Sequence, residues 1–353
     1  MTEQRQKLTL NKMSFKFIYL FLLLFTTISG NAQEISSLIL QPQDKTRYIG
    51  ESSTFVINAT LKEADYIVIE QSDITTTLEI KPQKDTYCKT INLNPGENTV
   101  FVTLYKDAKP IGKSSRVLYF LSELFEGVDE YELDEYKIRF FHQDAKEKKC
   151  ASCHNMTSNI PTNNEALEDV TKTTCYECHN SMISTKNTHA PAANWLCINC
   201  HNGKFGEYNM QDKGASKYLV ADPVAKTCAE CHEDVKEWEE SKFGHGPVND
   251  GRCERCHNPH GSDNEFFLRK SIWELCTTCH AEKSNGQHVT SAIGFGAPNK
   301  SGGHPTRDRE DPARPGRELT CSGCHNPHGS GGISLLRMKG TMPYGVCQRC
   351  HKK

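Results

Sequence analysis

The stretch from Cys253 to Ser262 reads Cys-Glu-Arg-Cys-His-Asn-Pro-His-Gly-Ser, and Cys321 to Ser330 repeats it as Cys-Ser-Gly-Cys-His-Asn-Pro-His-Gly-Ser. Its first half, Cys-x-x-Cys-His, occurs eight times in the last 204 residues of the 353-residue chain. In chain order, motifs one to eight span 150–154, 175–179, 197–201, 228–232, 253–257, 276–280, 321–325 and 347–351. Sixteen of the seventeen cysteines lie in these motifs, and only Cys88 is left over.

This spacing is the attachment site of c-type haem. Two thiols one helical turn apart can form thioethers with the two vinyl groups of a porphyrin, and the adjacent imidazole then reaches the iron as an axial ligand. Zinc would not require a histidine directly after the second cysteine, and a disulfide scaffold would show scattered spacings. Eight intact motifs therefore predict eight covalently bound c-type haems.

The motifs define two sets of site residues. The predicted thioether positions are Cys150, Cys153, Cys175, Cys178, Cys197, Cys200, Cys228, Cys231, Cys253, Cys256, Cys276, Cys279, Cys321, Cys324, Cys347 and Cys350. The predicted proximal ligands of the irons are His154, His179, His201, His232, His257, His280, His325 and His351.

Seven further histidines lie outside the motifs, and all seven follow residue 141. They are His142, His189, His245, His260, His288, His304 and His328. A lone histidine is usually an ordinary surface or core residue, but this segregation predicts that the seven are distal haem ligands. Eight irons with two imidazoles each would need sixteen histidines, and the chain has fifteen. One iron is therefore expected to bind Met156, Met182 or Met210, or to keep an open position.

The motif spacing indicates a two-motif unit that is used four times. His142, His189 and His245 each precede the first cysteine of an odd-numbered motif by eight residues, whereas His304 precedes its motif by seventeen. The extra nine residues are interpreted as an insertion that is rich in Arg, Asp and Pro. Units one to four span 142–179, 189–232, 245–280 and 304–351.

Units three and four carry a second spare histidine, His260 or His328, three residues after the odd-numbered motif. A Leu-Arg pair follows in each of these two units, Leu268-Arg269 and Leu336-Arg337. Thr157 and Lys204 stand in the place of this histidine in units one and two. By position, units three and four hold four spare histidines and units one and two hold one each. The missing ligand is therefore expected among motifs one to four.

The three-residue step from His257 to His260 limits what the second histidine can bind. Three residues reach at most about 10 Å, which is too short for the chain to pass around a porphyrin and bind both faces of one iron. Pro259 also keeps its preceding residue out of helical geometry and turns His260 away. The same argument applies to His325 and His328, so each second histidine is expected to serve a different haem from its neighbour.

On these motifs, residues 142–353 resemble the multihaem c-type cytochromes with a doubled CxxCH motif, which include cytochrome-c3-like proteins and decahaem conduits. The resemblance implies electron transfer between closely spaced haems. It also implies redox proteins as partners, such as a quinol dehydrogenase, an outer-membrane porin–cytochrome assembly or a terminal reductase.

Residues 1–32 read as a signal peptide. Four basic residues precede an apolar run over 17–28, and Gly30-Asn31-Ala32 resembles a cleavage site. The run is shorter than the roughly 20 residues that span a bilayer, so no transmembrane segment is expected after cleavage, and the protein is expected in the periplasm or outside the cell. Cleavage leaves 38 basic and 43 acidic residues, a net charge of −5, which disfavours nucleic acid as a partner.

Residues 33–121 predict an all-β sandwich. Short β-rich runs cover 38–40, 55–59, 66–70, 76–80, 91–93, 100–105 and 117–121, with turns expected at 94–96 and 109–112. The stretch 93–98 resembles an immunoglobulin-like domain. Cys88 is expected to be an inert, half-buried strand residue. An acidic linker is predicted over 122–141, followed at 142–353 by an octahaem domain of loops and short helices.

The function expected from the sequence is extracytoplasmic electron transfer by a carrier rather than an enzyme. Two alternatives stay open at this point. The first is a multihaem reductase of a small nitrogen or sulfur oxyanion at the one haem without a distal histidine. The second is a subunit of a filament in which haems stack between protomers.

Overall fold

The computed structural model describes residues 32–60, 63–124, 133–160, 167, 169–207, 209, 215–284, 304–337 and 344–351. The chain divides into two compact parts. The first, here called the β part, comprises residues 1–121 and 133–137, and the second, the motif part, comprises residues 122–132 and 138–353. The expected signal peptide, apart from its last residue, lies outside the described residues.

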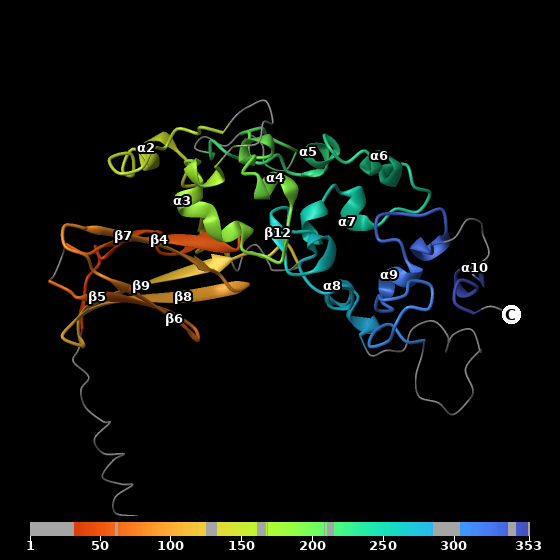
Figure 1. Ribbon diagram of the computed structural model, residues 1–353, viewed down its shortest axis with the longest axis horizontal. Coiled ribbons are helices and arrows are strands. Elements are labelled where there is room, and N and C mark those ends of the chain that lie inside the picture. The colour runs from red at the N-terminus through yellow and green to blue at the C-terminus, as the bar shows by residue number, and fades with distance from the viewer. Residues whose placement is uncertain are drawn as a thin grey trace, which may run out of the picture. The chain divides into compact units, whose positions relative to one another are not determined.

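Strands dominate the β part (Figure 1). They are β1 (Gln33–Glu34), β2 (Ile39–Gln41), β3 (Thr46–Tyr48), β4 (Ser52–Asn58), β5 (Tyr66–Gln71), β6 (Ile74–Glu79), β7 (Thr86–Asn92), β8 (Gly96–Lys106), β9 (Lys109–Phe120) and β10 (Lys137–Ile138). Each of the seven strand segments expected from the sequence overlaps one of them, so a strand-rich N-terminal region is confirmed.

Two sheets share one hydrophobic core. The larger has the order β10-β3-β9-β8-β5-β6, with β1 also paired to β9, and the smaller has the order β2-β4-β7. Alternate residues point inward, as in β4, where Ser53, Phe55 and Ile57 are buried and their neighbours are not. The fully buried side chains of Phe55 and Ile57 from the small sheet join Ile67 and Val100 from the large one.

The turn expected at 109–112 is wrong, because these residues begin β9. The chain reverses instead at Asp107 and Ala108, which have φ of 47° and 59°, the left-handed pair that a two-residue hairpin requires. Cys88 does lie on a strand, but it is exposed rather than half-buried. Its neighbour Tyr87 takes the inward position of β7.

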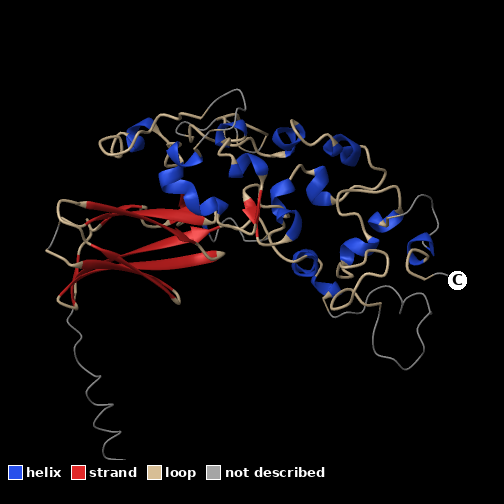
Figure 2. Ribbon diagram, in the orientation of Figure 1, coloured by secondary structure: helices blue, strands red, loops and turns tan. Residues whose placement is uncertain are grey.

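The motif part consists of loops and short helices (Figure 2). Its α-helices are α2 (Asp144–Glu147), α3 (Tyr176–His179), α4 (Ala190–Ala193), α5 (Ala225–Ala229), α6 (Asp234–Glu239), α7 (Gly246–Asn249), α8 (Ile272–Cys279), α9 (Cys321–Cys324) and α10 (Tyr344–Cys347). Its 3-10 helices are η2 (Val170–Lys172), η3 (Asn180–Ile183), η4 (Cys197–Asn199), η5 (Cys253–Arg255), η6 (Glu265–Phe267), η7 (Ala281–Lys283) and η8 (Ile333–Leu335). Strands β11 (Asn187–Thr188) and β12 (Gly261–Ser262) form a two-stranded sheet. No helix in the described ranges has the length and apolar character needed to cross a membrane.

Replacing Phe55 with alanine is expected to destabilise the β part by about 3–5 kcal/mol, because the fully buried ring would leave a cavity between the two sheets. Hydrogen exchange measured by mass spectrometry on peptides from β4 and β8 would report this loss. Phe101→Ala is the matched control, since Phe101 is 49% exposed and a surface change is worth about 0.5 kcal/mol or less. Equal effects of the two substitutions would contradict the shared core.

Candidate haem-binding sites

All eight Cys-x-x-Cys-His motifs fold as the same helical turn. In each, the histidine N–H donates to the carbonyl oxygen of the first cysteine at 2.8–3.0 Å. Residues three and four apart lie on one face of such a turn. Each turn therefore presents two thiols and an imidazole on the same side, as covalent attachment of one haem requires.

Thiols from consecutive motifs meet across the boundaries between the repeat units. The first cysteines of motifs two and three, four and five, and six and seven form hydrogen-bonded pairs, which are Cys175–Cys197, Cys228–Cys253 and Cys276–Cys321. Hydrogen bonding to the partner thiol, together with burial, raises the pKa of one member of each pair, namely Cys197, Cys228 and Cys276. None of the cysteines is in a disulfide.

Six proximal histidines lie opposite six of the spare histidines. The pairs and the distances between their ring centroids are His142–His179 at 6.1 Å, His189–His232 at 6.1 Å, His201–His260 at 6.0 Å, His245–His280 at 6.3 Å, His257–His328 at 5.9 Å and His304–His351 at 6.2 Å. Two imidazoles on opposite sides of one metal would have centres about 6 Å apart, given metal–nitrogen bonds of about 2 Å and about 1 Å from nitrogen to ring centre. The ring pairs thus fit an iron between them.

The pairing follows a rule that connects the units. The upstream histidine of each unit faces the even-numbered motif of its own unit, as His189 faces His232. The second histidine of units three and four faces the odd-numbered motif of the preceding unit, as His260 faces His201 and His328 faces His257. The expectation that the spare histidines of units three and four serve motifs of those two units is therefore wrong for His260, which faces motif three of unit two. The expectation that His260 does not bind the haem of motif five, which contains His257, agrees with this geometry.

Hydrogen bonds at Nδ1 orient many of these rings. Proximal rings bind backbone carbonyl oxygens, as His257 binds that of Phe266 at 2.7 Å and His325 that of Ser334 at 2.7 Å. Among distal candidates, His189 contacts the carbonyl oxygen of Pro259 at 2.8 Å. Such a partner fixes the proton on Nδ1 and leaves Nε2 for a metal.

Burial keeps several of the rings neutral. Burial, together with the charges of nearby histidines, lowers the pKa of His179, His260 and His328 to about 4 in each case. A neutral imidazole is the form that binds a metal. These three rings are therefore competent ligands throughout the neutral pH range.

The Leu-Arg pairs close the loop behind the odd-numbered motifs of units three and four. Arg269 donates its backbone N–H to the Cys256 carbonyl oxygen at 2.9 Å and its Nε to that of Glu254 at 2.6 Å. Arg337 does the same with the carbonyl oxygens of Cys324, at 2.9 Å, and Ser322, at 2.8 Å. Sequence reasoning recorded the repeat of this pair but missed its role, which the equal spacing could have signalled.

A glycine lets each second histidine approach the preceding unit. Gly261 and Gly329 have φ of 145° and 139°. A Cβ on Gly261 would lie 2.5 Å from the carbonyl oxygen of Asn187, and one on Gly329 would lie 2.8 Å from the Ser241 side chain. The glycine of the repeated stretch thus contacts the segment just before the preceding unit, and no larger residue fits at its position.

Motifs one and seven stand apart. The six ring pairs given above include neither His154 nor His325. His288 and Met210, which were further ligand candidates, lie outside the described residues. The Nδ1 of His154 contacts a carboxylate, Glu177 Oε2, at 2.8 Å.

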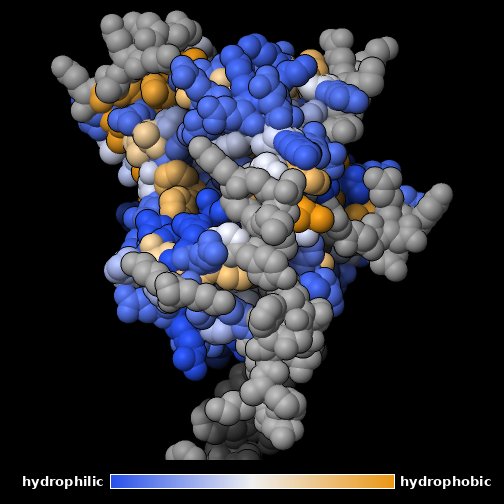
Figure 3. Space-filling view, turned by 90° about the vertical axis from the view of Figure 1, so that its right-hand side faces the viewer, coloured by the Kyte–Doolittle hydropathy of each residue, from blue (hydrophilic) through white to orange (hydrophobic). Residues whose placement is uncertain are grey.

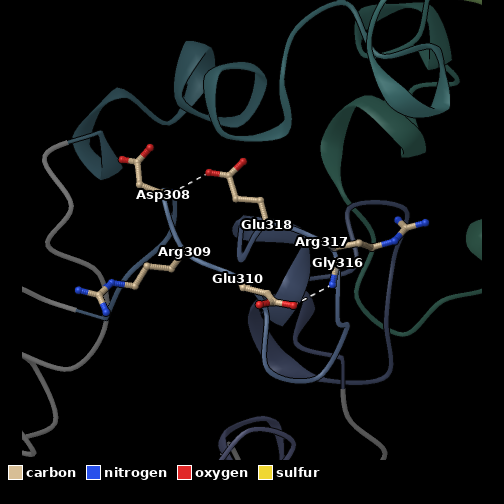
Figure 4. A pocket seen from close by; sticks show the side chains of 6 residues that line it. All are labelled: Asp308, Arg309, Glu310, Gly316, Arg317 and Glu318. Atoms are coloured by element: carbon tan, nitrogen blue, oxygen red, sulfur yellow. Dashed lines mark hydrogen bonds between the residues drawn. The ribbon is translucent and has the colours of Figure 1, made fainter.

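The insertion in unit four forms a shallow hollow between residues 308–310 and 316–318 (Figure 4). Its acidic side chains bind backbone within the loop, since Glu318 accepts from the Asp308 N–H at 2.7 Å and Glu310 from the Gly316 N–H at 2.9 Å. Figure 3 shows one face of the molecule, on which the described residues are mostly hydrophilic. These bonds give the loop its shape and do not involve the motif residues.

Comparison with known proteins agrees with this geometry. A family defined by a doubled CXXCH motif matches residues 142–184, 245–285 and 312–353, which contain motifs one, two and five to eight. These matches support a multihaem c-type cytochrome, and haem c is the group that the paired motifs bind.

A curated relative is the multiheme cytochrome MtrA of Shewanella baltica (strain OS185). It is 30% identical over 181 residues, which are 49% of this chain and 46% of the relative. The chain therefore spans about half the length of this relative.

Gly329→Ala is expected to break the close approach of unit four to the segment just before unit three, because the new Cβ would meet the Ser241 side chain at 2.8 Å. His328 would then withdraw from His257, and one low-spin haem per chain would become high-spin in electron paramagnetic resonance. Gly331→Ala serves as the control, because no atom lies within 4 Å of its added Cβ. An unchanged spectrum in Gly329→Ala would show that the close approach is not needed.

Proposed function

We propose that residues 142–353 hold eight c-type haems and that the protein carries electrons along them outside the cytoplasm. The observation that carries this proposal is the set of six imidazole pairs with centroids 5.9–6.3 Å apart. Each pair includes one proximal histidine from a Cys-x-x-Cys-His turn. Bound haem would supply one-electron chemistry, and the protein supplies its attachment, orientation and surroundings.

The proposed roles follow from the geometry. The sixteen motif cysteines form the thioethers, and the eight motif histidines are proximal ligands. The distal ligands are His142, His189, His245, His260, His304 and His328. His288 stays a candidate from the sequence.

The sites form a continuous series along the chain. His260, which faces motif three, also has His179 of motif two and His189, the partner of motif four, as electrostatic neighbours. Thiol pairs such as Cys228–Cys253 join motif four to motif five. Sites that share such contacts are close enough for electrons to pass from one to the next, which favours a carrier.

The remaining assignments complete the proposal. We assign residues 1–32 to a cleaved signal peptide and residues 33–121 to an immunoglobulin-like sandwich, since its two sheets share one core. An acidic linker over 122–141 leads to the octahaem domain. The partners are other redox proteins in the periplasm or outside the cell, as the resemblance to multihaem conduits implies.

Intact-mass spectrometry of the exported protein tests the number of haems. We expect the mass of the chain without its signal peptide plus eight haems, because all eight motifs form the same turn. Preparations from cells with the c-type haem attachment machinery and from cells without it should differ by this mass. A mass with six haems or fewer in the first preparation would contradict the proposal.

His260→Ala is expected to remove the sixth ligand from the haem on motif three and to leave the haem on motif five unchanged. The reason is that the ring centroid of His260 lies 6.0 Å from that of His201, in motif three. His260 does not pair with His257, the motif-five histidine that is its neighbour in the sequence. One low-spin signal should be lost. Introducing Cys197→Ser and Cys200→Ser together removes the haem on motif three, so the new high-spin signal should vanish in that background. A high-spin signal that persists would place the ligand elsewhere.

A further inference from the structure

The six imidazole pairs do not include His154 of motif one or His325 of motif seven. The only other histidine in the chain is His288, which lies outside the described residues. One histidine can complete at most one of the two irons. At least one of these motifs therefore keeps an axial position that no imidazole of this chain fills.

The repeat rule identifies the residue that stands where the partner of motif one would be. Since the second histidine of units three and four faces the preceding unit, the equivalent position for motif one is in unit two, and it is Lys204. The proximal ring of motif three is also held by a backbone carbonyl oxygen from the residues that follow it. His201 binds the carbonyl oxygen of Tyr218 at 3.0 Å, as His257 binds that of Phe266.

Lys204 makes a different contact from the histidines that it replaces. Its Nζ lies 3.8 Å from Glu230 Oε1, and the two side chains are 68% and 59% exposed. The amine is therefore paired with a carboxylate at the surface. In units three and four this position supplies an imidazole ring to the preceding unit. In unit two it supplies a surface cation instead.

The proximal side of motif one is also distinct. His201, His257 and His325 all direct Nδ1 to a backbone carbonyl oxygen, whereas His154 directs it to the Glu177 carboxylate at 2.8 Å. A carboxylate partner makes an imidazole a stronger donor to its metal. Strong electron donation from the proximal side is what activates ligands bound on the opposite side of a haem.

We propose that motif one is an exogenous-ligand site, which takes small neutral diatomic molecules of the carbon monoxide and nitric oxide class when its iron is ferrous. Glu177 is a positioning residue that acts through His154. This inference rests on the proposed function, since it requires haem on motif one.

The test uses the complete exported protein, after its haem content has been counted. Titration of the dithionite-reduced protein with carbon monoxide should give one molecule bound at motif one of each chain. The double variant Cys150→Ser, Cys153→Ser should lose this binding entirely. Glu177→Gln should keep it but lower the iron–histidine stretching frequency in resonance Raman spectra, and Glu177→Asp should restore part of the shift.

Lys204→His completes the repeat and should reduce carbon monoxide binding at least tenfold. Thr157→His is the matched control. Thr157 holds the equivalent position in unit one, and a histidine there would face a preceding unit, which the repeat does not have. Carbon monoxide binding should therefore be unchanged in this variant. Eight haems with no carbon monoxide binding, or binding that survives loss of the motif-one cysteines, would overturn this inference alone. Absence of haem would instead overturn the proposed function.

Discussion

The short reach of a histidine placed three residues after a proximal ligand organises the motif part. Three residues extend at most about 10 Å, so His260 cannot bind the second face of the iron that His257 serves. The structure turns His260 to His201 and His328 to His257, each in the preceding unit. This local steric limit connects the units, because units three and four each supply a ring to a site in the unit before them.

This connection compensates for a small core. The described motif part has few buried apolar side chains, among them Trp195, Val235 and Leu275, and its helices have eight residues or fewer. Such short helices are not stable alone. Haem bound between the ring pairs would supply apolar surface and metal–ligand bonds that hold the loops, whereas the β part has a core of its own.

The sequence was sufficient for the motifs, the four units and the strand-rich region, because each is a local pattern. The sequence also predicted that His257 and His260 do not bind the same iron. It could not say which other ring lies opposite His260. That choice depends on the close contact at Gly261 and on β11–β12 pairing between residues 187–188 and 261–262. The hairpin turn at Asp107-Ala108 was missed because alanine is not a usual turn former at positive φ.

A density map of the haem-loaded protein, read at the iron whose haem is attached to Cys197 and Cys200, tests the account most directly. The account predicts His201 on one face of that iron and His260, from the next unit, on the other. A map in which His260 binds the iron of the haem attached to Cys253 and Cys256, or binds no iron, would contradict the exchange of ligands between units.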